Sequence, residues 1–156
     1  MRGVALAFCL VFAHAQPPDS GARDRSLWNT IKRSLLAPGG DDFFEQNLKN
    51  ALVPGGSDGV RGFRATVISV RQSSIVLSVS DGKTPDVTIQ LNSGAHPSGL
   101  AAGDTVLFEG VGERFQREPF MLTLEIYGQA GFIEKAKGTA SVAHPATTTP
   151  APQAPS

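Results

Sequence analysis

The chain has 156 residues, 40% of them apolar, and equal numbers of acidic and basic side chains. This length allows one modest domain, and the charge balance lacks the basic excess typical of nucleic-acid-binding proteins. The single cysteine excludes an intramolecular disulfide and any metal site that needs two thiolates.

The first 15 residues have the layout of a secretory signal peptide. Arg2 precedes an apolar run over residues 4 to 12, and the small-residue triplet Ala13-His14-Ala15 follows. The run is too short to span a bilayer as a helix, and the alternative is a buried N-terminal strand or helix. Cleavage after Ala15 would remove Cys9, and export without disulfides favours a bacterial periplasm or exterior.

The last segment, residues 135 to 156, is rich in Ala, Thr, Pro and Ser and shows no apolar periodicity. Such a composition cannot bury enough surface to offset the entropy lost on ordering, so a disordered tail is predicted. It would serve as a spacer or simply be a frayed terminus.

An arm over residues 16 to 59 is predicted to hold two short helices, at residues 24 to 36 and 41 to 52. Each helix has an apolar residue at every fourth position, which is the spacing of one helix face. These residues are Leu27, Ile31 and Leu35, with Trp28 beside them, and Phe44, Leu48 and Leu52. Each helix is expected to stop at a proline–glycine sequence, APGG or VPGG.

From residue 62 the apolar period changes from that of a helix to that of a strand. Five strands are predicted: GFRATVISV (62–70), SIVLSVS (74–80), DVTIQLN (86–92), DTVLFEGVG (104–112) and FMLTLEIYG (120–128). Five short strands suit a small closed sheet, so residues 60 to 134 are expected to form a mainly β, five-stranded, OB-like antiparallel barrel. An SH3-like barrel and a small open meander are the alternatives.

The strand order and the segment LAAGDTVLFEGVG resemble an OB-fold, in which a Gly-Asp dipeptide often begins the fourth strand. Together with NLKNALVPGG, DGKTPDVTIQL and EPFMLTLEI, these residues resemble an uncharacterised domain of secreted bacterial proteins, of an acidobacterial type. The resemblance covers about residues 27 to 128. Some members of that family also carry tetratricopeptide repeats, which this chain lacks, and the family supplies no catalytic residues to transfer.

Enzymatic chemistry has little support in this sequence. After signal removal two histidines remain, His96 and His144, and His144 falls in the predicted tail. His96 could act as a general base with Ser93 and Asp104, but sequence proximity in a Gly-rich segment does not establish a triad. A surface histidine is the simpler interpretation, so no catalytic residue is predicted and a hydrolase is the remote alternative.

Neither a metal nor a cofactor is predicted. One usable histidine without cysteine is a poor ligand set. Asp81 and Asp86 flank a tight turn, where aspartate is favoured because it hydrogen-bonds the local backbone. They are therefore interpreted as turn residues, with calcium binding as the alternative.

The charged segment GERFQREP, residues 112 to 119, is predicted to connect the last two strands as a loop. Arg114 and Arg117 could grip an acidic partner with Phe115 as a contact. Alternatively, Phe115 caps the barrel end while the charges pair in water with little net benefit. The candidate ligand-binding residues are Arg64, Thr88, Gln90, Arg114, Phe115, Arg117, Glu125 and Tyr127.

These patterns predict an exported, non-enzymatic binding or adapter module for a peptide, glycan or protein. Nucleic acid is disfavoured because residues 60 to 134 contain six basic and eight acidic residues and only Tyr127 among outward aromatics. The alternative is a structural or assembly component of the bacterial envelope that acts through its helical arm.

Overall fold

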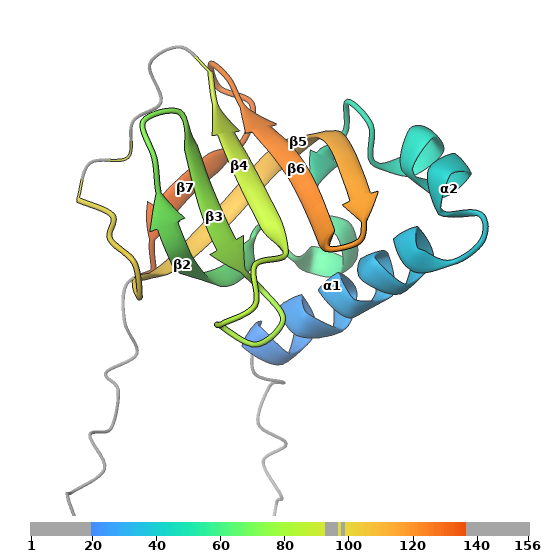
Figure 1. Ribbon diagram of the computed structural model, residues 1–156, viewed down its shortest axis with the longest axis horizontal. Coiled ribbons are helices and arrows are strands. Elements are labelled where there is room, and N and C mark those ends of the chain that lie inside the picture. The colour runs from blue at the N-terminus through green and yellow to red at the C-terminus, as the bar shows by residue number, and fades with distance from the viewer. Residues whose placement is uncertain (1–19, 93–96, 98, 137–156) are drawn as a thin grey trace, which may run out of the picture.

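The computed structural model describes residues 20–92, 97 and 99–136, with two helices before a mainly β region (Figure 1). The predicted signal peptide lies outside the described residues, as does the predicted tail apart from Lys135 and Ala136. The elements are α1 (Ser20–Leu36), α2 (Gly40–Asn47), β1 (Leu52–Val53), a 3-10 turn (Ser57–Gly59), β2 (Phe63–Val70), β3 (Ser74–Ser78), β4 (Val87–Leu91), β5 (Thr105–Arg117), β6 (Phe120–Ile126) and β7 (Phe132–Lys135).

Helix α1 forms as the apolar spacing predicts, although it begins four residues earlier than expected. Trp28, Ile31 and Leu35 share one face and are buried. Leu27 is only partly buried and borders the same core. The helix ends at Leu36, before the proline at position 38. In Figure 1 it lies across one end of the strands, so its apolar face closes that end of the core.

The second predicted helix is wrong at its C-terminal end, because α2 stops at Asn47. Beyond it, Asn50 takes a left-handed conformation with φ of 58°. The Asn50 N–H then donates to the Gly112 carbonyl at 2.8 Å, and the Gly112 N–H donates to the Ala51 carbonyl at 3.0 Å. Pairing with β5 therefore replaces the last helical turn, and Leu52 begins strand β1 instead of ending a helix.

The strands form one mixed seven-stranded sheet. Its central pairings run from β2 to β3, β4, β6 and β5, and β5 pairs again with β2, so the pairings form a circuit. The expectation of antiparallel pairs throughout is wrong for β4 and β6, which run parallel because β5 intervenes between them in the chain. The open-meander alternative is also wrong, since β5 pairs with β2 rather than with β4.

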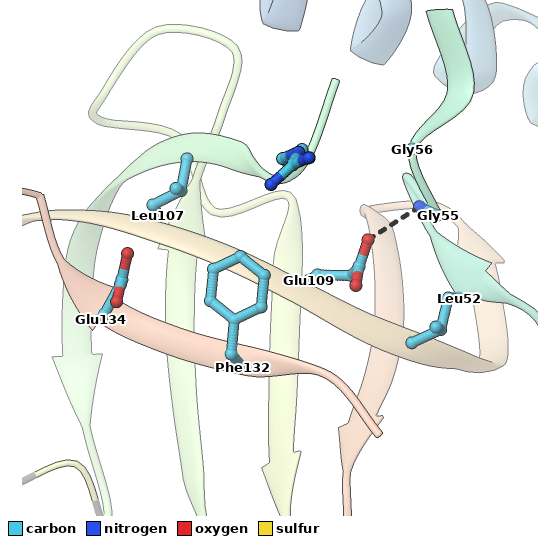
Figure 2. Close-up of a pocket in the computed structure, with 8 residues that line it drawn as sticks. Leu52, Gly55, Gly56, Leu107, Glu109, Phe132 and Glu134 are labelled. Carbon is cyan, nitrogen blue, oxygen red and sulfur yellow. Dashed lines mark hydrogen bonds between the residues drawn. The ribbon is translucent and has the colours of Figure 1, made fainter. Parts of the chain in front are cut away.

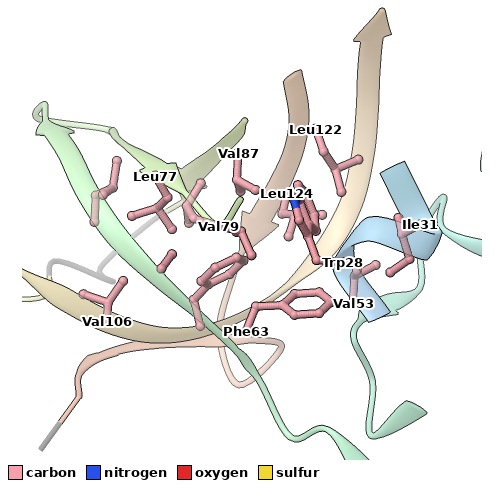
Figure 3. Close-up of a cluster of buried hydrophobic side chains, with 14 of the residues drawn as sticks. Trp28, Ile31, Val53, Phe63, Leu77, Val79, Val87, Val106, Leu122 and Leu124 are labelled. Carbon is pink, nitrogen blue, oxygen red and sulfur yellow. The ribbon is translucent and has the colours of Figure 1, made fainter. Parts of the chain in front are cut away.

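The alternation within the predicted strands is confirmed. One side of β2, β3, β4 and β6 is buried at every second residue, and helix residues join the same core. Figure 3 shows Trp28 from α1 packed among strand residues that include Phe63 and Leu124. The indole meets the Phe63 and Phe120 rings edge-on, with centroids 5.6 and 6.2 Å away. The arm and the sheet therefore share a single hydrophobic core.

The segment GERFQREP is not the loop that the sequence predicted. Strand β5 continues to Arg117, and only Glu118 and Pro119 separate it from β6. Residues 114 to 117 pair directly with residues 120 to 123 of β6 after a register shift between Gly112 and Arg114. Charged and polar residues hid this strand because only one side of its end contacts the core, through Phe115, while Arg114 and Gln116 are exposed.

The two aspartates of the predicted turn have different roles. Asp81 is a turn residue as predicted: its carboxylate accepts the Lys83 and Thr84 N–H groups, both at 2.7 Å. The bond from the Thr84 backbone, followed by those from the Thr84 hydroxyl and the Lys83 backbone, lowers the pKa of Asp81. Asp86 also hydrogen-bonds the backbone beside the turn, as predicted, because it accepts the Val79 and Ser80 N–H groups, but it is buried, with 1% of its surface exposed.

Asp86 joins α1 to the start of β4. Its Oδ1 accepts the Val79 N–H at 2.8 Å, and its Oδ2 accepts the Ser80 N–H at 3.1 Å and the Ser80 hydroxyl. The indole N–H of Trp28 donates to the same Oδ2 at 3.2 Å and to the Ser80 hydroxyl at 3.1 Å. A buried carboxylate with four donors is well satisfied, so this cluster specifies where α1 docks.

Replacing Asp86 by asparagine should lower the free energy of unfolding by about 2 kcal/mol, because one acceptor oxygen becomes a donor facing other donors. Trp28→Phe keeps an aromatic ring but removes the indole donor, and should cost about 1 to 2 kcal/mol. Urea denaturation of the two single variants and the double variant measures both costs. The double variant should lose less unfolding free energy than the two single variants lose together, because the two residues share an interaction.

Glu118→Gln serves as the matched control, since Glu118 is exposed in the β5–β6 turn. Its effect should stay within about 0.5 kcal/mol. If the double variant lost as much unfolding free energy as the Trp28 and Asp86 variants together, the two residues would not be coupled.

Candidate functional site

The structure brings part of the predicted polar face together. Thr88 and Gln90 of β4 point away from the core, and Gln90 lies opposite Glu125 of β6 in the parallel register. Tyr127 follows Glu125 by two residues and is 46% exposed. These four residues form one outward surface over β4 and β6, here called the polar face.

The three predicted residues of β5 have partners within the chain. Arg114 lies opposite Thr123 of β6 and pairs with its neighbour Glu113 at 2.8 Å. Arg117 pairs with Asp41 of α2 at 2.9 Å and so ties the end of β5 to the arm. Both pairs are exposed and contribute little stability.

Phe115 faces inward. Its ring lies 5.2 Å from the Phe44 ring of α2, and the residue borders the hydrophobic core. This packing agrees with the interpretation of Phe115 as a cap, while Arg114, Gln116 and Arg117 are the exposed residues of this strand end.

Arg64 is not part of the polar face. It lies on β2, whose neighbours are β3 and β5, so a full strand separates it from β4. Its side chain is exposed and lines two hollows beside the start of α1. Arg114 lies in one row with Thr88, with Thr123 of β6 between them, so it borders the polar face. Of the other predicted residues, Arg64 and Arg117 lie elsewhere on the surface, and Phe115 faces inward.

Sequence reasoning missed a groove on the outer face of β5, shown in Figure 2. It has a volume of about 760 Å³ and is bounded by β1 and the following turn on one side and by β7 on the other. The residues lining it are Leu52, Gly55, Gly56, Arg61, Leu107, Glu109, Phe132 and Glu134. Leu52 is 44% exposed, which leaves apolar surface open to a ligand.

Two glycines shape this groove. A Cβ at Gly62 would lie 3.0 Å from the Phe132 ring and 3.1 Å from Leu107, so these side chains pack more closely over a glycine than over any larger residue. Gly55 has φ of 62°, and a Cβ there would lie 2.5 Å from the Leu52 carbonyl. The glycines of the VPGG sequence, expected to end a helix, build the groove wall instead.

The charges of the groove are mixed. The Glu109 carboxylate accepts the Gly55 N–H at 2.9 Å, which holds this acid against the wall (Figure 2). Glu134 lies beside Phe132 on β7, and its neighbour across the strand pair is Leu107. An apolar floor with two carboxylates and one arginine can bind a chain that carries apolar and basic groups.

Within the described residues, no cluster of three histidine, cysteine or acidic side chains is arranged to hold a metal ion. Among the same residues, no helix has the length and apolar character needed to cross a membrane. His96, the only histidine considered as a general base, lies outside the described residues.

Comparison with known proteins identifies no relative: no family model matches the chain, and neither does any curated protein or solved structure. The resemblance to a secreted bacterial domain therefore stays a prediction.

Strands β1 and β7 escaped prediction because they have only two and four residues. The available signal was weak: Phe132 and Ile133 follow Gly131, and Leu52 and Val53 precede the Pro54-Gly55 sequence. Only their pairing with β5 makes strands of them, and the groove depends on both.

Replacing Gly62 by alanine should displace Phe132 and Leu107 and cost about 1 to 3 kcal/mol of stability through overpacking. Gly39→Ala is the matched control, because a Cβ there meets nothing within 4 Å and the backbone φ is −93°. Thermal unfolding of both variants measures the difference. Equal melting temperatures of the Gly62→Ala and Gly39→Ala variants would mean that Phe132 and Leu107 accommodate the added methyl group at no cost in stability.

Proposed function

We propose that this protein is an exported, non-enzymatic binding module built on an OB-like β-barrel. The circuit of five strand pairings supports this fold, because a closed sheet removes the edges that an open one would expose. The covering of one end by α1 supports it as well. Export is proposed from the signal-like first 15 residues.

The groove over β5 is the main support for a binding function. Its two sides present the exposed Leu52 and the half-buried Phe132 to a concave site, where apolar side chains gain most from contact with a partner. Its length follows strands β5 and β7, so an extended segment fits it better than a helix. Glu109 and Glu134 favour basic side chains. The proposed ligand is an extended peptide segment with alternating apolar and basic residues.

The ligand can be sought by panning a random peptide display library against the purified protein. Enriched peptides should share an apolar and basic pattern, and Phe132→Ala should weaken their binding at least about tenfold, as for a central aromatic contact. Calorimetric titration of synthetic peptides measures this loss. Glu134→Gln should weaken binding less and make it less sensitive to salt.

Tyr127→Ala is the control, because it also removes an aromatic ring that solvent reaches, but on the polar face. If Tyr127→Ala weakened peptide binding and Phe132→Ala did not, the binding site would lie on the polar face instead. Absence of any enriched peptide, together with binding to a glycan array, would replace the peptide by a sugar ligand.

A structural role through the arm is the second candidate. An arm that docks partners should expose an apolar stripe, but its large apolar residues mostly enter the shared core. In the described helices, Leu36 is the exposed large apolar side chain, at 46%. The arm is thus better suited to covering the sheet than to recruiting a partner.

Deleting residues 16 to 59 tests this difference. The remaining chain should aggregate or lose its fold, because removal of Trp28, Leu35 and Phe44 uncovers one end of the core. Size-exclusion chromatography and circular dichroism measure the result. A folded, monomeric product would contradict the covering role and favour the arm as an interaction element.

A further inference from the structure

Four arginines gather where the start of α1 meets β2. Arg23 and Arg25 belong to the first two turns of α1, whereas Arg61 and Arg64 lie just before and within β2. All four are exposed. Segments about 40 positions apart in the chain therefore bring like charges to one place, which costs energy through repulsion.

The local electrostatics does not explain this cluster as a structural feature. The first turn of α1 has no acidic residue, although the helix dipole favours acids there and disfavours arginines. Among the described side chains, no ion pair joins any of the four arginines to an acid. The positive charge thus stays available to a ligand.

Arg64 separates two adjacent hollows. One, of about 270 Å³, is lined by Arg23, Arg61 and Arg64 together with the buried Asp24, which has interactions of its own. The other, of about 350 Å³, is lined by Arg25 and Arg64, with the Thr66 hydroxyl as a further donor. Ser78 and Ser80 also border it, but their hydroxyl groups already donate to Asp81 and Asp86.

Asp81 also borders the second hollow, but its oxygens accept hydrogen bonds from its own loop. Oδ1 accepts the Ser78 hydroxyl at 3.0 Å besides two backbone N–H groups, and Oδ2 accepts the Thr84 hydroxyl at 2.7 Å. This carboxylate is therefore directed at the turn rather than at the arginines.

We propose that the two hollows flanking Arg64 form a site for a ligand that carries two neighbouring phosphate groups. The planar guanidinium fork binds phosphate oxygens in pairs, and hydroxyl donors complete such sites. One phosphate would lie between Arg23, Arg61 and Arg64, and the other between Arg64 and Arg25. Among the residues that the structure describes, no aromatic side chain lines either hollow, so the phosphates rather than stacked bases would be recognised.

The test is calorimetric titration of the purified protein with sodium tripolyphosphate and, in parallel, co-sedimentation with phosphatidylcholine vesicles with and without phosphatidic acid. Arg64→Gln removes the arginine common to both hollows and leaves the groove over β5 intact, so this result is independent of peptide binding. The matched control is Arg71→Gln, with the same charge change roughly 20 Å away along β2.

Arg64→Gln should weaken binding at least about tenfold, and Arg71→Gln less than about twofold, with both variants melting like the parent. Arginine-dependent binding of tripolyphosphate supports a free phosphorylated ligand, and arginine-dependent binding of phosphatidic acid alone supports a lipid headgroup. Absence of binding to either probe, or equal effects of the two variants, overturns the proposal. Tighter binding of an oligothymidine than of tripolyphosphate overturns it in favour of a nucleic acid.

Discussion

The buried contact between Trp28 and Asp86 is the constraint on which the rest of the structure depends. The carboxylate has 1% of its surface exposed, so it must be satisfied by protein groups, and the indole N–H from α1 is one of its donors. The same ring packs edge-on against Phe63 and Phe120. Trp28 thus joins the helix to the strands and to the β3–β4 connection. Its apolar ring packing and its polar N–H hydrogen bond both specify the same docking position for α1.

That docking determines what lies on the surface. With α1 held across one end of the sheet, its first two turns bring Arg23 and Arg25 beside β2 and Arg64. Strand β5 determines the other candidate site. It pairs with β1, β2, β6 and β7, and its outer face becomes a groove because two short strands flank it. The peptide groove and the nearer hollow of the arginine cluster share Arg61 and Leu107.

The predictions that held were those that depend on local periodicity. Alternate residues of the predicted strands face the core, as Ile75, Leu77 and Val79 illustrate. In α1, Ile31 and Leu35 are buried as their spacing indicates. The predictions that failed depend on contacts distant in sequence. Gly112 pairs with the chain after α2 and ends that helix early, and β6 draws residues 114 to 117 into a strand despite their charges. The predicted site residues scattered because alternation shows which side faces outward, but not which strands are neighbours.

The sequence by itself determined that the protein is mainly β with two preceding helices, and which side of each long element is buried. These properties follow from the period of apolar residues, which is a local property of the chain. Only the tertiary structure decided that β4 and β6 run parallel, that β1 and β7 exist, and that four arginines meet beside β2. Strand order, short-strand formation and charge clustering arise from contacts between distant segments, and no local pattern encodes them.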